Sequence, residues 1–287
     1  MHDLHEANRR SWNAATKQHN THKGDQAAFL RDGGSTLFPE EIELLGDVRG
    51  KSLVHLQCNA GQDTLSIASK LGATVTGIDI SDEAITFAQQ LAQDSGIPGT
   101  FSRADVYEWF KTNTAQFDVV FSSYGAICWL SDLTAWAQGI AAALKPGGHF
   151  VLVEFHPMLG ILEGALSGDW SQAEDYLGGQ HAAYEYGVGD YVAMSEGGLT
   201  LDGNPVPAGP EWVNPNPAHE FAWGLADVVQ PLLQAGLALS TLHEYPYSNG
   251  FMPDPEKMVE IPGRRMTFGE EMPKIPLMFG IRAEKRT

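Results

Sequence analysis

The fold is decided by residues 54–63, which read Val-His-Leu-Gln-Cys-Asn-Ala-Gly-Gln-Asp. The pattern predicts a short apolar strand, a tight turn and the start of a helix. Such a turn points backbone N–H groups and a helix N-terminus at a bound cofactor. A nucleotide cofactor also needs a carboxylate at the end of the next strand for its ribose hydroxyls, and Asp79 stands there. The other reading of Asp79 is a cap for the helix that begins at Ser81.

Strands and helices alternate outward from this turn. Helices of about 10–15 residues between short apolar strands indicate right-handed crossovers and a parallel sheet. The fifth strand is almost entirely apolar, as a strand buried on both faces should be. We therefore predict an α/β fold: a Rossmann-like, seven-stranded, mostly parallel sheet with helices on both faces. The predicted strands are 52–57, 73–78, 100–103, 117–122, 149–155, 237–243 and 275–282, and the main helices are 63–71, 81–95, 133–144 and 223–234.

Two segments stand outside this alternation. Residues 1–50 predict two or three short helices, interrupted at 32–36, and we interpret them as an N-terminal helical lid. Residues 156–218 are rich in Gly, Pro, Tyr and acids without a clear helical period, and they are too long for a plain loop. We predict a cap-like insertion with short strands there, within a main domain that spans 51–287.

The overall composition excludes several classes of partner. The net charge is −18 in 287 residues, and no basic run occurs. We therefore exclude a nucleic-acid partner, because binding phosphates depends on Lys and Arg. No stretch approaches the roughly 20 apolar residues that cross a bilayer, and the first residues lack the apolar core of a signal peptide. We expect a cytoplasmic protein without a membrane partner; its oligomeric state is left open.

Cysteine and histidine do not predict a metal site. Cys58 and Cys128 lie in apolar, strand-like stretches and read as buried thiols of a reducing compartment, with a disulfide as the less favoured alternative. The ten histidines are scattered, and none is paired with cysteines at ligand spacing. We therefore expect no metal.

Five segments in a fixed order resemble one known family. They are the turn at 54–63, the acidic strand end at Asp79, Ala-Asp-Val at 104–106, Phe-Asp-Val-Val-Phe-Ser at 117–122 and Leu-Lys-Pro-Gly-Gly at 144–148. Together, over about residues 50–155, they resemble the class I S-adenosylmethionine-dependent methyltransferases. More closely, residues 55–58, 61–65 and 153–157 resemble a large bacterial subfamily of small-molecule methyltransferases.

The resemblance implies S-adenosylmethionine as the cofactor and S-adenosylhomocysteine as its product. It also implies that Asp105 hydrogen-bonds the adenine amino group while Val106 and Ile80 pack against the ring. Ser122, at the end of the fourth strand, would lie beside the sulfonium. The expected cofactor-binding residues are His55, Gln57, Asn59, Gly61, Thr64, Asp79, Ile80, Asp105, Val106 and Ser122.

The turn departs from the family's usual pattern at three positions. His55 stands in place of an acid, and Gln57 and Asn59 stand in place of glycines. Because Asn tolerates a left-handed backbone better than most residues, the turn can survive. The missing acid is an expected partner of the cofactor's charged amino-acid end. His55, Gln57 and residues 33–36 are the candidates to replace it.

The fifth strand ends in two candidate general bases, Glu154 and His156. They alternate with Val153 and Phe155, so both side chains lie on one face of the strand. The alternative is that they only hold the insertion in place by hydrogen bonds. We place Tyr124 with them as the third catalytic candidate.

Aromatic side chains around the predicted cleft indicate an aromatic or heterocyclic acceptor, although core packing explains any one of them alone. The predicted substrate-binding residues are Trp129, Tyr184, His219 and Trp223. Methylation at carbon, nitrogen and oxygen all fit. Transfer from a sulfonium is an in-line displacement, so the protein mainly aligns the acceptor and excludes water.

Two other functions stay open from the sequence. One is an NAD-dependent oxidoreductase on the same scaffold, against which the absence of a Gly-x-Gly-x-x-Gly turn and the presence of the 144–148 turn argue. The other is a non-catalytic module that binds the cofactor, which the altered turn allows. The fold alone does not choose between them, because one α/β scaffold hosts many chemistries.

Overall fold

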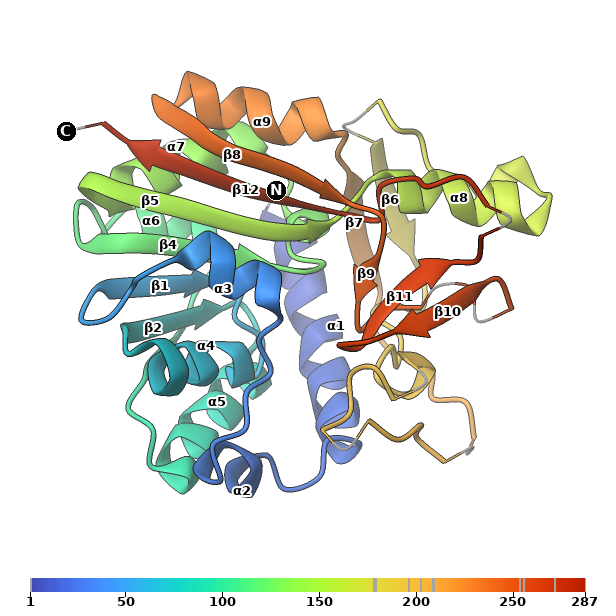
Figure 1. Ribbon diagram of the computed structural model, residues 1–287, viewed down its shortest axis with the longest axis horizontal. Coiled ribbons are helices and arrows are strands. Elements are labelled where there is room, and N and C mark those ends of the chain that lie inside the picture. The colour runs from blue at the N-terminus through green and yellow to red at the C-terminus, as the bar shows by residue number, and fades with distance from the viewer. Residues whose placement is uncertain are drawn as a thin grey trace.

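The central layer of the protein is a seven-stranded sheet. The computed structural model describes residues 2–177, 180–195, 197–201, 203–207, 210–252, 254, 256–270 and 272–286. The strands lie in the order β3-β2-β1-β4-β5-β12-β8 (Figure 1). Their bounds are β1 (Ser52–Leu56), β2 (Thr74–Asp79), β3 (Thr100–Arg103), β4 (Phe117–Ser123), β5 (Leu144–Phe155), β8 (Leu237–Tyr245) and β12 (Met278–Lys285).

Most neighbouring strands in this sheet are parallel. β12 runs antiparallel to both β5 and β8, whereas the pairs from β3 across to β5 are parallel. Parallel neighbours need long crossovers, and helices supply them here. The predicted Rossmann-like, mostly parallel sheet is confirmed. The crossover helices are α4 (Gln62–Ser66), α5 (Asp82–Ser95), α6 (Val106–Phe110), α7 (Leu133–Ala143) and α9 (Leu225–Gln234).

Helices cover both faces of the sheet, as predicted. Val119 and Val120 are neighbours in β4, so their side chains point to opposite faces, and both are fully buried. Val120 belongs to a core cluster with Trp136 of α7 and Leu232 of α9. Val119 belongs to a second cluster with Leu45 of α3 (Pro39–Leu45). The sheet is therefore the buried middle layer of three.

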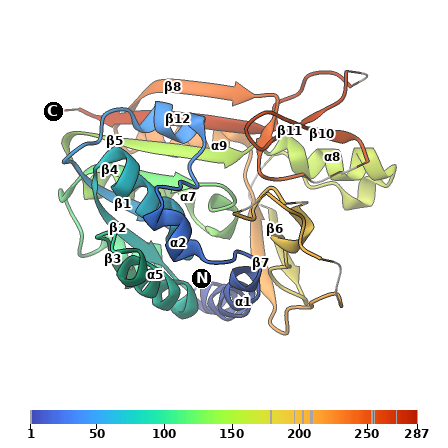
Figure 2. The same ribbon diagram turned by 60° about the horizontal axis from the view of Figure 1, so that its bottom comes forward.

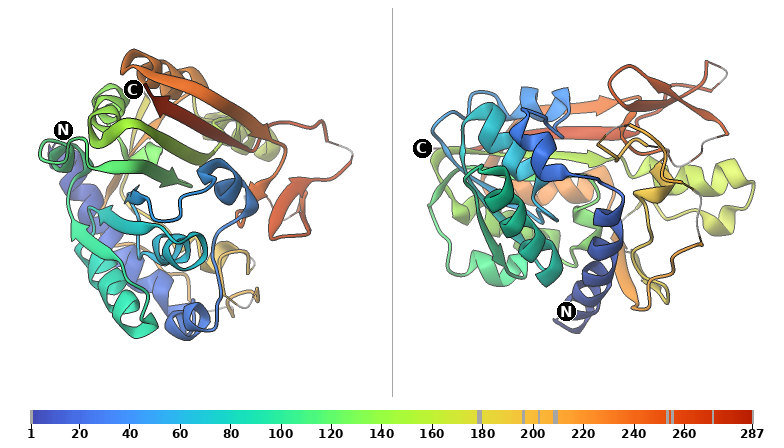
Figure 3. Two further views of the ribbon diagram at one scale, coloured as in Figure 1. Left: turned by 60° about the vertical axis from the view of Figure 1, so that its left-hand side comes forward. Right: turned by 90° about the horizontal axis from the view of Figure 1, so that it is seen from below.

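The N-terminal segment differs from the prediction of two or three short helices. It begins with one long helix, α1 (His2–Thr21), and continues with α2 (Gln26–Arg31) and α3. α1 lies against α5 and against β7 (Ala218–Ala222), beside the main sheet (Figures 2 and 3). A 20-residue helix is stable there because polar contacts hold it along its length.

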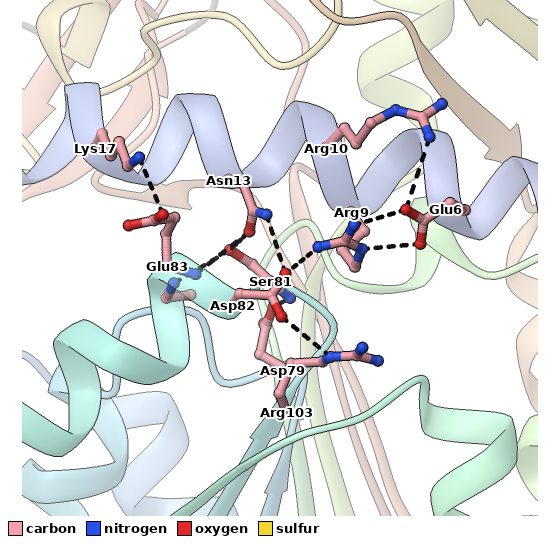
Figure 4. A network of polar contacts seen from close by, with 11 residues as sticks. Glu6, Arg9, Arg10, Asn13, Lys17, Asp79, Ser81, Asp82, Glu83 and Arg103 are labelled. Carbon is pink, nitrogen blue, oxygen red and sulfur yellow. Dashed lines mark hydrogen bonds and ion pairs between the residues drawn. The ribbon is translucent and has the colours of Figure 1, made fainter.

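Polar side chains fasten α1 to the start of α5 (Figure 4). Ser81 Oγ donates to Asn13 Oδ1 at 2.7 Å, and Lys17 Nζ lies 3.0 Å from Glu83 Oε1. Arg9 also forms an ion pair with the carboxylate of Asp82. Since α5 follows directly on β2, these contacts place the N-terminal helix over the end of that strand.

Two further segments gather at the carboxyl ends of the parallel strands (Figure 1). The segment after β5 contains α8 (Met158–Ser167) and β6 (Gln180–Tyr184), which pairs antiparallel with β7. The short strand agrees with the sequence prediction, but the helix was missed. The segment after β8 forms a small sheet, β10-β11-β9, whose strands are Met258–Ile261, Arg265–Phe268 and Ser248–Asn249.

The division of the chain into a lid at 1–50 and a main domain at 51–287, with an insertion at 156–218, stays a prediction. Over the part of the chain that is described, no helix combines the length and apolar character needed to cross a membrane. Cys58 and Cys128 are free thiols rather than a disulfide.

Candidate active site

One large cavity lies at the carboxyl ends of the parallel strands. Its volume is about 760 Å³, in the range typical of ligand sites. The turn after β1 lines one part of it, together with Asp79 and Asp105. Tyr124, after β4, and Phe251, after β9, line another part. The cavity therefore joins the predicted cofactor turn to segments that lie far from it in the sequence.

The turn after β1 has an unusual backbone. Gln57, Asn59 and Gly61 have φ angles of 53°, 48° and 80°, in the left-handed region. At Gly61 a Cβ atom would lie 2.8 Å from Ala88 Cβ and 2.9 Å from the ring of Phe101. Glycine is therefore required there for space as well as for conformation.

Replacing Gly61 with alanine is expected to lower the free energy of unfolding by about 2–5 kcal/mol. Left-handed strain of about 1–2 kcal/mol adds to overpacking of about 1–3 kcal/mol. Urea unfolding measures the loss. Gly96→Ala is the matched control, because Gly96 has a φ of 71° but nothing within 4 Å of the position of its Cβ. Equal losses in the two variants would contradict the packing argument.

Asp79 ties the turn to the end of β2. Its carboxylate accepts hydrogen bonds from the backbone N–H of Asn59 at 2.9 Å and of Ser81 at 2.8 Å. The side chain is partly buried and lines the cavity, and its burial raises the pKa to about 6. The N-cap of α5 is Ser81, whose side chain accepts from the backbone N–H of Ala84, so Asp79 is not the helix cap that one reading of the sequence proposed. Asp79 instead holds the backbone before the helix and faces the space where a ribose would bind.

Asp105 is held by the N-terminal helix. His5 Nδ1 lies 2.6 Å from its carboxylate, and the backbone N–H of Tyr107 donates to it at 2.9 Å. The imidazole of His5 also stacks on the ring of Tyr107 with 5.3 Å between centroids. Burial alone would raise the pKa of Asp105, but the hydrogen bond from His5 lowers it below its ordinary value. An adenine amino group would therefore meet an ionised carboxylate.

His55 occupies the place of the missing acid and carries no charge at neutral pH. Burial lowers its pKa to about 4. Its ring nitrogens lie 2.8 Å from Thr64 Oγ1 and 3.2 Å from Ser123 Oγ. His55 therefore holds the turn against β4 and α4 and does not replace the charge of an acid.

Sequence relatives match the central part of the chain. Residues 54–148 match the family described as a methyltransferase domain. The chain is 31% identical over 124 residues to a ubiquinone biosynthesis O-methyltransferase of Paramagnetospirillum magneticum, covering 43% of this chain and 48% of that protein. It is 30% identical over 135 residues to an uncharacterized methyltransferase of Synechocystis sp., covering 45% and 59%. The chain thus spans about half the length of the curated relatives it matches.

Solved structures share the fold over most of the chain. An S-adenosylmethionine-dependent methyltransferase from Mesorhizobium loti has a TM-score of 0.53 and 20% identity, covering 88% of this chain and 99% of that one. A second, from Methanosarcina mazei, has a TM-score of 0.53 and 18% identity, covering 87% and 98%. Residues 54–148 therefore match a methyltransferase domain, and the fold around them is that of S-adenosylmethionine-dependent methyltransferases. The predicted methyltransferase family is confirmed over residues 54–148, and the predicted fold over most of the chain. Methyl transfer by the whole protein and S-adenosylmethionine as its cofactor stay predictions.

The residues of this methyltransferase domain fit that cofactor. Its adenosine part is rich in hydrogen-bond donors, and the carboxylates of Asp79 and Asp105 are acceptors at the cavity wall. Gln57 also lines the cavity, and its Oε1 atom is buried without a partner among the described residues. A buried acceptor of this kind needs a donor, which a ligand would supply. The role of each residue stays a prediction.

The methyltransferase domain brings most of the predicted cofactor residues to the cavity. Gly61 and Thr64 do not line it and instead support the turn from behind. Ser122 is fully buried and faces away, whereas Ser123 lines the cavity, because neighbours in β4 point to opposite faces. The predicted residues that line the cavity are His55, Gln57, Asn59, Asp79, Ile80, Asp105, Val106, Tyr124, Trp129 and Tyr184.

Glu154 does not face this cavity, contrary to its assignment as a base. Its carboxylate accepts four backbone hydrogen bonds, from Gly125 at 2.5 Å, Phe155 at 2.7 Å, Ala126 at 2.9 Å and Ile127 at 3.2 Å. Burial raises its pKa, and these donors oppose the rise. The structure thus favours the alternative reading, in which Glu154 shapes the loop after β4.

Three other predicted residues also lie outside the main cavity. His156 Nδ1 accepts from the backbone N–H of Met158 at 3.1 Å, and its Nε2 lies 3.0 Å from Glu244 Oε1. Trp223 donates to the carbonyl of Leu130 at 3.0 Å and, with His156, borders a separate cavity of about 170 Å³. His219 packs on His181, and its Nδ1 atom lies 3.0 Å from Nε2 of His181. Each serves to hold the segment after β5.

The sequence analysis missed the cavity residues that come from distant segments. Asn249 comes from β9 and Arg264 from the turn between β10 and β11, in a stretch that no local pattern related to the site. The N-terminal segment contributes to the cavity lining as well, and its role as a lid stays a prediction. Helix α1 supplies His5, Asn8 and Trp12 to the cavity lining, and the connections between the helices supply Lys23, Thr36 and Phe38.

Proposed function

We propose that this protein transfers the methyl group of S-adenosylmethionine to a small acceptor that carries an aromatic or heterocyclic ring. One observation carries the proposal: the predicted cofactor residues and a group of aromatic side chains line the same cavity. A methyl donor and a methyl acceptor that bind in this cavity would lie next to each other, with no protein segment between them. The absence of a nucleic-acid partner and a cytoplasmic location stay predictions.

The aromatic part of the cavity suits a flat ring. Phe38 lies 6.0 Å from Tyr124, Tyr124 lies 5.6 Å from Phe155, and Phe155 lies 4.9 Å from Phe251, between ring centroids. Aromatic pairs at these distances offer both faces and edges to a further ring. Their apolar surface would also exclude water from the transfer.

Tyr124 can orient the acceptor through its hydroxyl group. Asn249 Nδ2 donates to the Tyr124 oxygen at 2.9 Å, which leaves the phenolic proton available to a ligand. Burial keeps the pKa of Tyr124 well above its ordinary value, so the phenol stays protonated. Tyr124 therefore acts as a hydrogen-bond donor to the acceptor rather than as a base.

S-adenosylmethionine supplies an already activated methyl group when it is bound. The protein's contribution is alignment, which can be worth up to about 7–11 kcal/mol. Carbon, nitrogen and oxygen acceptors all remain candidates. The name of the relatives, O-methyltransferase, makes ring hydroxyls the first acceptors to test.

The decisive experiment is calorimetric titration with S-adenosylmethionine, S-adenosylhomocysteine and NAD. We expect micromolar binding of the first two and none of NAD. An acceptor screen with ring hydroxyls follows, with methylated product detected by mass. Tighter binding of NAD would favour an oxidoreductase and overturn the proposal. Cofactor binding without transfer to any acceptor would instead favour a non-catalytic module.

A further inference from the structure

Two opposite charges face the cavity near the turn after β1. Lys23 lies between α1 and α2, and Asp63 lies in the first turn of α4. Neither forms an ion pair with any residue that the structure describes. Burial lowers the pKa of the Lys23 ammonium group, and the charge of Asp63 opposes that shift. Charges that are partly buried and unpaired are costly, so a ligand that pairs with them would be favoured.

Neighbouring side chains hold these two residues in place. Thr36 Oγ1 donates to Asp63 Oδ1 at 2.5 Å, which leaves the other carboxylate oxygen for a ligand. Gln62, next to Asp63, donates to Gln26 Oε1 at 2.5 Å. This bond joins the start of α4 to the start of α2, so the Lys23 segment is anchored beside Asp63.

The order of the strands indicates which part of the cofactor lies there. Asp79 ends β2 and Asp105 follows β3, where the ribose and the adenine are expected. The next strand in the sheet is β1, and its turn leads directly into α4. The end of the cofactor opposite the adenine would therefore reach the Asp63 side. That end is an amino acid, with one ammonium and one carboxylate group.

We propose that Asp63 binds the ammonium group of this amino-acid end and that Lys23 binds its carboxylate. Together they replace the acid that the turn lacks, because His55 at that position is uncharged. This inference rests on the proposed function and names residues that its cofactor would contact. The segment 33–36 takes part through Thr36, which orients Asp63.

The test compares two ligands that differ only in the amino-acid end. S-adenosylhomocysteine has it, and 5′-methylthioadenosine lacks it. We expect Asp63→Asn and Lys23→Met each to weaken S-adenosylhomocysteine binding by at least about tenfold, since hydrogen bonds to charged groups are strong. Both variants should bind methylthioadenosine as the unchanged protein does. Calorimetry on the full chain measures the six affinities of these three proteins for the two ligands.

Three controls separate this proposal from its alternatives. Lys23→Arg keeps the charge and should retain most of the affinity. Thr36→Val removes the hydrogen bond to Asp63 but not the charge, and should have a smaller effect than Asp63→Asn. Lys145→Met removes a lysine that pairs with Asp118, outside the residues that line the cavity, and should leave the affinity unchanged. Equal losses of affinity in Lys145→Met and Lys23→Met, or no loss in Lys23→Met, would overturn the assignment of Lys23.

The outcomes also separate this inference from the proposed function. If the unchanged protein binds S-adenosylhomocysteine but neither charge variant discriminates between the two ligands, only this inference fails. If both variants weaken the two ligands equally, the residues support the cavity and do not contact the amino-acid end, and the inference also fails. If the unchanged protein binds neither ligand, the proposed function fails with it.

Discussion

Replacing Asp79 with alanine is expected to weaken S-adenosylhomocysteine binding by at least about 100-fold. Two hydrogen bonds from ribose hydroxyls to a carboxylate contribute about 1.5–3 kcal/mol each to binding. A loss of about 2.7 kcal/mol raises the dissociation constant about 100-fold. The variant also frees the backbone N–H of Asn59, which Asp79 holds at 2.9 Å. The turn would then lose both its anchor and its ligand contact. Titration calorimetry measures the change.

Asp118→Ala is the matched control. Asp118 lies at the opposite end of the sheet and accepts from Ser52 N at 2.8 Å, Ser52 Oγ at 2.7 Å and Lys145 Nζ at 2.9 Å. Its loss should lower stability without changing ligand affinity. An Asp79→Ala variant that stays folded and binds S-adenosylhomocysteine normally would exclude Asp79 from the ribose site.

The pH dependence of binding gives a second readout for Asp79. Because burial raises its pKa from 3.8 to about 6, the folded protein without ligand takes up a proton there more readily than the unfolded chain does. Its contribution to stability is complete below about pH 4 and is lost as the pH rises through about 6. Ligand hydroxyl groups favour the ionised form, so affinity should fall as the pH drops below about 6. Asp79→Asn should remove this dependence.

Local sequence patterns were sufficient for the sheet and for the cofactor half of the cavity. Parallel strands end at one edge, so the turn after β1, the acid that ends β2 and the acid that follows β3 must meet there. That rule placed Asn59, Asp79 and Asp105 correctly at the cavity wall. It needed no knowledge of how distant segments pack.

The rule that parallel strands end at one edge of the sheet could not predict which face of a strand borders the cavity. Glu154 in β5 and His156 just after it border the smaller cavity and not the main one; Glu154 contacts the loop after β4, and His156 contacts the start of α8. Likewise Ser123, rather than Ser122, faces the cavity. Alternation defines two faces of a strand; only the packing of the long insertions decides which one borders the ligand. Asn249 and Arg264 depend on that packing entirely.

Replacing Glu154 with alanine is expected to lower the free energy of unfolding by about 3–5 kcal/mol. Four backbone N–H groups would lose their shared acceptor. Each unsatisfied buried group costs about 1–3 kcal/mol, but water that enters the space left by the side chain would satisfy some of these groups and reduce the total cost. Urea unfolding with the native tyrosine and tryptophan fluorescence measures the loss. Few single substitutions cost this much, so the effect is diagnostic.

Glu154→Gln separates this structural role from a role as a base. Glutamine keeps the shape and one carbonyl acceptor, so we expect about half of the alanine variant's loss of stability, and methyl transfer at saturating acceptor should persist. A catalytic base would give the reverse result: unchanged stability and lost turnover. The loop that Glu154 holds carries Tyr124 at its start and Trp129 near its end, and both line the cavity. A buried carboxylate outside the cavity thus determines the shape of the acceptor site without touching the acceptor.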